Sequence, residues 1–330
     1  MKFIKGYKGK QCHDMYMLRG YDFYKNMLDS NNEKYSKYKY KIKSIDDYEC
    51  LLCGKTKGEV VLTWKEKYQL ISCDNCHAVT ANIDCSLEQE YVSELYNEAQ
   101  FEIVKKSMLS TYQYRKKTFG KERYEYCIKR LKLNEDKISV LDIGCGVGYF
   151  LSVLKEKNIH SMGLEVDAFQ VGFCKSNGLN VTDSDVSNLD EKKFDLIVMF
   201  DVLEHLTNPT EMFRSLSSKL KDGGRIIAYT PFIHSFGFEL MSERQNLLYP
   251  FQHVCFYNEV SLNYLSRSTG LKVENIDYYG LDIADYLLYK EYEDSYPYMK
   301  KLHDLACLMQ SVLDKAEISN HLRVTFYKDS

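Results

Sequence analysis

The feature of this sequence that most limits its fold is an apolar run that ends in closely spaced glycines. Residues 138–143 read Ile-Ser-Val-Leu-Asp-Ile, and Gly144, Gly146 and Gly148 follow at alternate positions. Apolar residues at helical spacing begin at Tyr149. Glycines at such a junction allow positive φ and let a ligand approach the main chain. The start of the following helix supplies unpaired N–H groups. The run therefore predicts a buried strand, a ligand-binding turn and a helix.

The chain beyond residue 137 repeats this alternation of strand-like and helix-like segments. Repeated strand–helix units predict a parallel sheet that is covered by helices on both faces. The alternating pattern of residues 322–327 favours a final strand at the edge of that sheet. We therefore predict an α/β fold with a Rossmann-like, doubly wound and mostly parallel sheet of seven strands. The predicted strands are 138–143, 160–164, 180–182, 194–200, 225–230, 271–278 and 322–327.

The composition permits a large folded core and gives no sign of a membrane segment. Apolar residues make up 45% of the 330 residues, and the formal net charge of −3 does not suit a chain coated in basic charge. No apolar run approaches the roughly 20 residues that a membrane helix needs. The eleven cysteines are an odd number, which does not suit a disulfide framework. We expect a cytoplasmic protein with no membrane partner.

The charge is distributed unevenly along the chain. Residues 1–45 hold eleven Lys and Arg against four Asp and Glu, so their charge is 11 − 4 = +7. The Lys/Tyr-rich segment 1–47 is interpreted as a solvated arm or a docking segment, and the alternative is a surface for an anionic partner. A helical connector at 87–130 and a main domain at 131–330 follow, with insertions at 231–257 and 281–319 that would form a substrate lid.

Two cysteine pairs mark a separate small module at residues 48–86. Cys50 and Cys53 form one Cys-x-x-Cys pair, Cys73 and Cys76 form the other, and nineteen residues separate the pairs. This spacing is typical of four-cysteine zinc sites, in which two turns close a tetrahedron around the ion. Four thiolates leave no open position, so the predicted Zn²⁺ is structural. Free thiols or a redox pair are the alternatives.

Several further motifs surround the glycine turn. A dinucleotide site favours Gly-x-Gly-x-x-Gly, whereas this turn has Gly-x-Gly-x-Gly with Asp142 two residues before it. The fourth strand and its continuation, 194–209, contain Phe-Asp-Leu-Ile and Leu-Glu-His before a proline. With Tyr229-Thr230-Pro231 and the segment 252–257, the sequence resembles class I S-adenosylmethionine-dependent methyltransferases of types 11, 12 and 23 over about residues 48–280. The cysteine module resembles the zinc-ribbon-like start of some bacterial members.

The resemblance implies a cofactor site for S-adenosylmethionine. The glycine turn would hold the methionine part, and an acid at the end of the second strand would accept hydrogen bonds from the ribose hydroxyls, as in other nucleoside sites of this fold. An acid after the third strand, Asp185 with Asp183 as the alternative, would bind the adenine amino group, and the end of the fourth strand would face the cofactor. The implied residues are Asp142, Gly144, Cys145, Gly146, Gly148, Glu165, Asp185, Val186, Phe200 and Asp201.

Three histidines are candidates for proton removal, His205, His253 and, in the insertion, His234, for which a structural or exposed role is the stronger alternative. Methyl transfer is an in-line displacement at a sulfonium, so the enzyme positions the acceptor and removes its proton. A neutral histidine is the usual base near pH 7, and we predict that role for His205 and His253. Helix capping or packing is the alternative for both. Glu204 and His205 could also join a hard metal ion, although no cluster of carboxylates accompanies them in the sequence.

The sequence leaves three hypotheses for function. The first is methylation of a small molecule or carbohydrate, a precursor of a polysaccharide or secondary metabolite, because relatives with a zinc module and a Leu-Glu-His segment belong to such pathways. The second is an RNA methyltransferase that uses the basic N-terminal segment and the zinc module. The third is a non-catalytic scaffold that binds the cofactor. The acceptor and the oligomeric state stay open.

Overall fold

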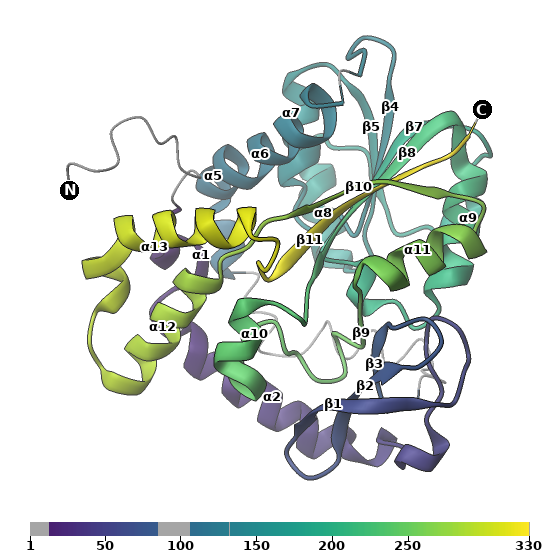
Figure 1. The fold of residues 1–330 in the computed structure, drawn as a ribbon. Coiled ribbons are helices and arrows are strands. Elements are labelled where there is room, and N and C mark those ends of the chain that lie inside the picture. Colours follow the sequence, from purple (N-terminus) through teal and green to yellow (C-terminus); the bar gives the residue numbers. More distant parts are fainter. Residues whose placement is uncertain (1–12, 85–105, 132, 330) are drawn as a thin grey trace.

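The computed structural model describes residues 13–84, 106–131 and 133–329 (Figure 1). Its centre is a seven-stranded sheet with the order β10-β11-β8-β7-β4-β5-β6. The Rossmann-like α/β fold is therefore confirmed, and the strands lie within a few residues of the predicted runs. They are β4 (Ser139–Ile143), β5 (His160–Leu164), β6 (Val181–Thr182), β7 (Phe194–Phe200), β8 (Leu220–Pro231), β10 (Lys272–Tyr278) and β11 (His321–Tyr327).

The last strand, β11, is the one whose position in the sheet was predicted incorrectly from the sequence. β11 lies between β8 and β10 and pairs antiparallel with both, so the prediction of an edge strand is wrong. The alternating pattern suggested one solvated face, but Arg323 and Thr325 are buried on that face. The Arg323 guanidinium lies 3.5 Å from the ring centre of Tyr279 and pairs with Glu122, which accounts for the burial of its charge.

Helices cover both faces of the sheet, as its apolar strands require. On one face, α9 (Pro209–Lys219) and α11 (Glu259–Ser268) pack on the odd-numbered side chains of β7. On the other, α7 (Tyr149–Glu156) and α8 (Ala168–Ser176) pack on its even-numbered side chains. A helical segment that contains α5 (Tyr112–Arg115) and α6 (Lys121–Tyr124) joins this second face, and two π-helical turns interrupt it at 116–120 and 125–129. The predicted connector residues 87–105 lie outside the described residues.

The cysteine module forms a second, four-stranded sheet with the order β1-β2-β3-β9. β1 (Gly58–Trp64), β2 (Tyr68–Cys73) and β3 (Val79–Ala81) come from the module itself. The fourth strand, β9 (Cys255–Phe256), comes from the end of the insertion in the main domain and pairs with β3. The module is thus built onto the insertion that carries His253.

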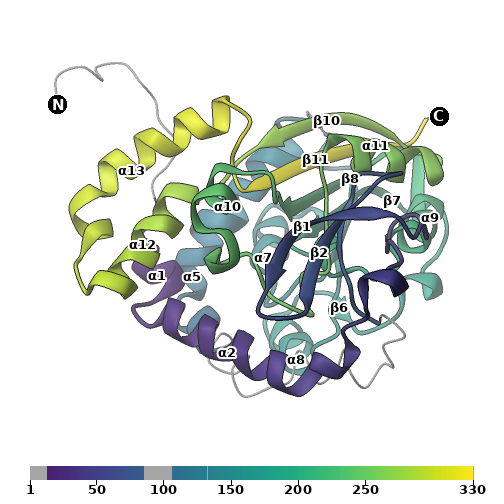
Figure 2. The same cartoon turned by 60° about the horizontal axis from the view of Figure 1, so that its bottom comes forward.

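The described part of the basic N-terminal segment, residues 13–47, is docked on the body of the molecule. α1 (Met15–Arg19) and α2 (Phe23–Tyr38) lie beside α10 (Phe236–Met241) and α12 (Asp282–Asp294) in Figures 1 and 2. Several hydrogen bonds hold it there. Among them, Tyr24 donates to the Asp285 carbonyl, the Asn31 side chain donates to the Leu248 carbonyl, and Lys34 donates to Gln252. α13 (Tyr298–Lys315) completes this end of the molecule.

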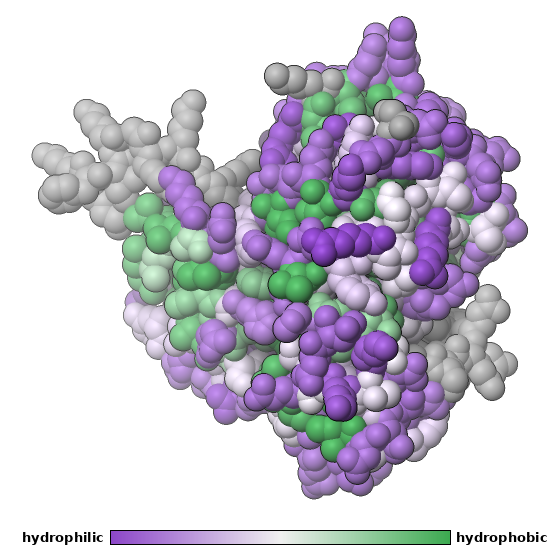
Figure 3. Space-filling view, turned by 45° about the vertical axis from the view of Figure 1, so that its right-hand side comes forward, coloured by the Kyte–Doolittle hydropathy of each residue, from purple (hydrophilic) through white to green (hydrophobic). Residues whose placement is uncertain are grey.

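The surface carries both polar and apolar side chains, and an apolar area lies on α13. The outward side of α13 exposes Leu302, Leu305, Met309 and Val312. Figure 3 shows hydrophobic side chains gathered on the left of the molecule, at the end where α13 lies. Among the helices that the structure describes, none combines the length and the apolar composition needed to cross a bilayer.

Candidate active site

The glycine turn adopts the conformation that the sequence predicts. It connects β4 to α7, and Gly144, Gly146 and Gly148 have φ values of 65°, 57° and 75°. A Cβ added to Gly144 would lie 2.5 Å from a methyl carbon of Val202, so a side chain is excluded there by space as well as by backbone conformation. Cys145 between them is buried. The turn therefore presents bare backbone at the carboxyl edge of the parallel strands, where ligands bind in such sheets.

Glu165 is connected directly to this turn. It follows β5, it is 8% exposed, and its carboxylate accepts hydrogen bonds from the Gly146 and Asp167 N–H groups at 2.8 and 3.0 Å. Burial raises the pKa of Glu165, and these two bonds oppose the rise. Each carboxylate oxygen has a further lone pair, so Glu165 can accept hydroxyl donors without losing its bonds to the turn.

Asp142 lies directly beneath the turn and is 2% exposed. Its Oδ1 has no hydrogen-bond partner within the described part of the chain. Burial raises its pKa to about 7, with Arg123 acting in the opposite direction and Glu165 adding to the rise. A buried carboxylate oxygen without a donor is costly. This orphaned acceptor therefore fits a ligand that brings a donor, such as the ammonium group of an amino acid.

Asp185 and Val186 follow β6, the strand next to β5. The Asp185 side chain is exposed and caps a short 3₁₀ turn by accepting a hydrogen bond from the Ser187 N–H at 2.7 Å. Hydrogen bonds from the Ser187 hydroxyl and then from this N–H hold the pKa of Asp185 below its usual range. Val186 is buried. The capping role competes with the predicted adenine contact for one carboxylate oxygen only.

Asp201 stands at the end of β7 and has a positive φ of 59°. Its side chain is 51% exposed and lies 3.5 Å from the Arg123 guanidinium and 3.6 Å from His321 Nε2. Burial by neighbouring atoms raises its pKa, but His321 and Arg123 outweigh this and lower it to about 2. The Arg123 guanidinium also lies over the Phe200 ring at 4.2 Å.

Arg123 and His321 are site residues that the sequence analysis missed. Arg123 lies on α6, before the glycine turn, and reaches the site only because its helix packs against α7. His321 begins the strand that was expected at the edge of the sheet. Arg123 could have been predicted from the sequence, because it lies on the helical segment that precedes the glycine turn. His321 could not, because its position near Asp201 depends on the order of the strands in the sheet.

The structure brings His205 and His253 together, although the insertion separates them in the sequence. Their ring centres are 4.7 Å apart, and with Glu204 their ligand atoms all lie within 4.8 Å of one another. His205 Nδ1 lies 2.8 Å from the Gln252 carbonyl, and His253 Nδ1 lies 2.7 Å from the Leu247 carbonyl. Burial lowers the pKa of both imidazoles, most strongly for His253. Both are therefore neutral near pH 7, as a base must be.

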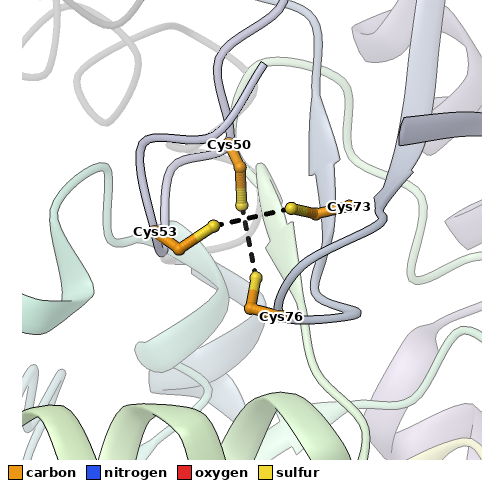
Figure 4. Close-up of side chains that lie close together, drawn as sticks. All are labelled: Cys50, Cys53, Cys73 and Cys76. Carbon is orange, nitrogen blue, oxygen red and sulfur yellow. Dashed lines mark hydrogen bonds between the residues drawn. The ribbon is translucent and has the colours of Figure 1, made fainter. Parts of the chain in front are cut away.

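The four cysteines of the module converge on one point (Figure 4). Cys50 and Cys76 have their sulfurs 3.5 Å apart, and so do Cys53 and Cys73. Four sulfurs at about 2.3 Å from a zinc ion lie about 3.8 Å from one another, so little movement separates this arrangement from a tetrahedral site. The Cys76 thiol bond lowers the pKa of Cys50 to about 5, and the same bond raises the pKa of Cys76. A bound dication would replace the proton that the Cys50 and Cys76 sulfurs share, so the two sulfurs would no longer compete for it.

The remaining described cysteines lie outside this cluster. Cys127, Cys145, Cys174 and Cys255 are free and buried. Cys307 is disulfide-bonded, which the odd cysteine count did not lead us to expect. Cys12 and Cys85 lie outside the described residues.

Comparison with known proteins agrees with this geometry. A family model for a methyltransferase domain matches residues 114–276. The ubiquinone biosynthesis O-methyltransferase of Coxiella burnetii is 27% identical over 114 residues, which are 31% of this chain and 49% of that protein. Phosphoethanolamine N-methyltransferase 1 of Arabidopsis thaliana is 26% identical over 119 residues, 33% of this chain and 24% of that protein. The chain spans about half the length, or less, of these curated relatives.

Solved methyltransferases also align with the chain. A SAM-dependent methyltransferase from Archaeoglobus fulgidus has a TM-score of 0.47 and 20% identity, and the match covers 64% of this chain and 94% of that one. A possible histamine N-methyltransferase from Thermotoga maritima has a TM-score of 0.45 and 18% identity, with 69% and 100% covered. The family model thus identifies a methyltransferase domain over residues 114–276, and the strand order of the large sheet is that of the predicted Rossmann-like fold.

Proposed function

We propose that the protein transfers a methyl group from S-adenosylmethionine to a small-molecule or carbohydrate acceptor. One observation carries the proposal. Within the matched domain, the glycine turn, the orphaned Asp142 carboxylate and the Glu165 carboxylate meet at the carboxyl edge of β4 and β5. The cofactor contributes a methyl group on a sulfonium, which is already a good leaving group. The residues of this chain bind it, orient the acceptor and handle one proton.

The donors and acceptors present fit the parts of that cofactor. Asp142 and the glycine turn would hold the methionine ammonium, and Arg123 is the cation placed to bind its carboxylate. Glu165 would accept the ribose hydroxyls, while Asp185 and the Val186 N–H would bind the adenine. Phe200 and Asp201 would line the side toward the reacting methyl group.

The acceptor side is assigned to the histidine pair and the insertions around it. By itself the pair offers a neutral imidazole as general base, and His205 is the more accessible of the two, since His253 is only 8% exposed. The insertions 231–257 and 281–319 cover this region together with α1 and α2. An acceptor small enough to lie under such a cover is favoured over a folded RNA.

The N-terminal segment supports the RNA alternative less than its positive charge suggested. Arg19 forms an ion pair with Asp285, and Lys34 is 6% exposed and bonds to Gln252. These cations stabilise the fold and are not displayed to phosphates. The scaffold alternative has no specific observation in its favour, since the turn, Glu165 and the histidines are all in place.

Zinc and location belong to the same proposal. We assign a structural Zn²⁺ to Cys50, Cys53, Cys73 and Cys76, supported by their number, chemistry and separation. We also propose a cytoplasmic location, supported by the eight free cysteines of the described residues, with the Cys307 disulfide as the contrary observation.

The test is calorimetric binding of S-adenosylmethionine and S-adenosylhomocysteine. The wild type should bind both, and Glu165→Ala and Gly146→Val should each lose at least ten-fold in affinity. Valine at position 146 conflicts with a φ of 57°, and its Cβ would lie 3.2 Å from Gln170. Asp190→Ala, at an exposed acid outside the predicted cofactor contacts, is the matched control and should bind normally. Folded wild-type protein that binds neither compound would refute the proposal.

A further inference from the structure

Arg115 is a half-buried cation whose hydrogen bonds all go to neutral partners. It is the last residue of α5, and its guanidinium lies in the contact between this helix and α1. Its Nε donates to the Thr111 hydroxyl at 2.9 Å, and its Nη2 donates to the Leu18 carbonyl. These two bonds use two of the five N–H groups of a guanidinium. Three N–H groups therefore remain for a ligand.

A second arginine, Arg19, follows the residue that Arg115 binds. One edge of its guanidinium is held by Asp285, whose Oδ1 lies 3.4 Å from Arg19 Nη2. Its Nε is buried and lacks a hydrogen-bond partner among the residues that the structure describes. A buried donor without an acceptor is costly. Arg19 Nε is thus a second donor that a ligand at this contact would satisfy.

A third arginine, Arg123, lies two helical turns beyond Arg115 on the same helical segment, and its charge is already paired with Asp201. Burial lowers the pKa of Arg115. Tyr149 opposes this fall, and the charges of Arg19 and Arg123 add to it. The three arginines face two carboxylates, Asp285 and Asp201, so one positive charge is in excess at the place where Arg115 stands.

This group of arginines is connected to the acceptor side of the site through Tyr249. The Tyr249 ring lies 5.0 Å from the His253 ring, measured between their centres. On its other side the tyrosine is near Arg19: burial raises the pKa of Tyr249, and the charge of Arg19 opposes the rise. The arginines therefore lie next to the region that the proposed function gives to the acceptor.

A structural role alone does not explain an arginine at position 115. The bond to the Leu18 carbonyl needs one donor, which glutamine or lysine would supply without an excess of guanidinium groups. An arginine stays ionised at any ordinary pH, so the repulsion is not relieved by loss of a proton. Its planar fork matches the two oxygens of a carboxylate or a phosphate. A π-helical turn directly follows it at 116–120, and such turns are frequent at functional sites.

We propose that Arg115, with Arg19 Nε beside it, binds an anionic group of the methyl acceptor, a carboxylate or a phosphate. The inference rests on the proposed function and narrows its substrate class to small anionic acceptors. Arg115 then orients the acceptor by a charge-assisted hydrogen bond and takes no part in moving its proton. A small anion reaches this contact between helices, unlike the phosphates of a folded RNA.

The experiment is a calorimetric titration at low ionic strength with inorganic phosphate and, separately, with acetate. The protein is first saturated with S-adenosylhomocysteine, so that the cofactor's own carboxylate occupies its site. We expect one phosphate or one acetate per chain, and the anion that binds identifies the acceptor group. Affinity should fall at least ten-fold in Arg115→Gln, which keeps a donor for the Leu18 carbonyl. Arg115→Lys keeps the charge without the fork and should recover part of the affinity.

Lys117→Gln is the matched control, because it removes an exposed cation two residues further along the same segment. It should bind the anion like the wild type, and thermal unfolding checks that all variants are folded. The inference is overturned if folded wild type binds neither anion, or if Arg115→Gln binds as well as wild type. It is also overturned if S-adenosylhomocysteine weakens anion binding, since Arg115 then belongs to the cofactor site. Anion binding by protein that binds no S-adenosylhomocysteine would refute the proposed function and leave the anion site in place.

Discussion

Asp142 illustrates how single side chains at this site are held for a ligand. The acid was predicted from its place before the glycines, and the structure adds that its Oδ1 is buried and unpaired among the described residues. Asp201 has the opposite environment, with Arg123 and His321 holding its pKa at about 2. Two acids at adjacent strand ends therefore differ in protonation near neutral pH, which the sequence cannot show.

The pH dependence of stability should reveal the state of Asp142. Its pKa is raised to about 7 in the folded, ligand-free protein, so the folded state holds a proton that the unfolded state releases near pH 4. Stability from this group is therefore lost as pH rises from about 4 to about 7. Asp142→Asn should remove this dependence and raise the free energy of unfolding at pH 7 by about 2–4 kcal/mol.

Urea unfolding of the wild type and Asp142→Asn at pH 5 and pH 8 is the measurement. The variant should also lose cofactor affinity, since an amide is a weaker partner for an ammonium group. Equal stability differences at the two pH values would show that Asp142 is ionised throughout, and the account of its burial would be wrong.

At the scale of elements, the features predicted correctly are those that depend on a local pattern of residues. The strands β4 and β7 were found because each is an apolar run followed by a glycine or an acid, and the cysteine cluster was found because its spacing is local. The place of β11 and the pairing of β9 with β3 were missed, since strand order depends on contacts between distant residues. The Glu204–His253 proximity was missed for the same reason, although both histidines were predicted as a catalytic pair.

The cysteine module should be coupled to the histidine pair through β9. Cys53→Ser removes one zinc ligand, and we expect loss of zinc and a lower melting temperature. The Val254 N–H donates to the Glu204 carbonyl, and the Ala81 N–H donates to the Val254 carbonyl, so loosening of β3 should reach His253. Amide hydrogen exchange of residues 252–257 should become faster while S-adenosylmethionine binding persists.

Colorimetric zinc release, thermal unfolding and amide hydrogen exchange of residues 252–257 together measure this coupling. Cys127→Ala is the control, because Cys127 is a buried cysteine of the main domain outside the cluster. If Cys53→Ser releases zinc and leaves this exchange and the melting temperature at wild-type values, the module is independent of the site.

At the scale of the whole molecule, the N-terminal segment is part of the folded body. Arg19 pairs with Asp285 on α12 at 3.4 Å, and Asp285 is 0% exposed. Removal of one partner from a buried ion pair leaves an uncompensated charge. Arg19→Met should therefore cost about 2–4 kcal/mol in the free energy of unfolding.

A double-mutant cycle checks this prediction by chemical denaturation. Adding Asp285→Asn to Arg19→Met should recover part of the loss, because the unpaired charge is then absent. Lys25→Met is the matched control, because its ion pair with Asp29 is exposed and screened by solvent and should contribute little to stability. If Arg19→Met and Lys25→Met cost the same, the segment is only loosely attached.

The source of β9 also has a consequence for synthesis on the ribosome. The three strands of the module emerge early. The partner of β3, at residues 255–256, is made only after the five parallel strands of the large sheet, β4 to β8. Until then β3 has an open edge, and an open edge invites pairing with another chain. Early capture of zinc would keep the nascent module in one conformation during that wait, so zinc supply during translation should influence the yield of correctly folded protein more than zinc supply afterwards.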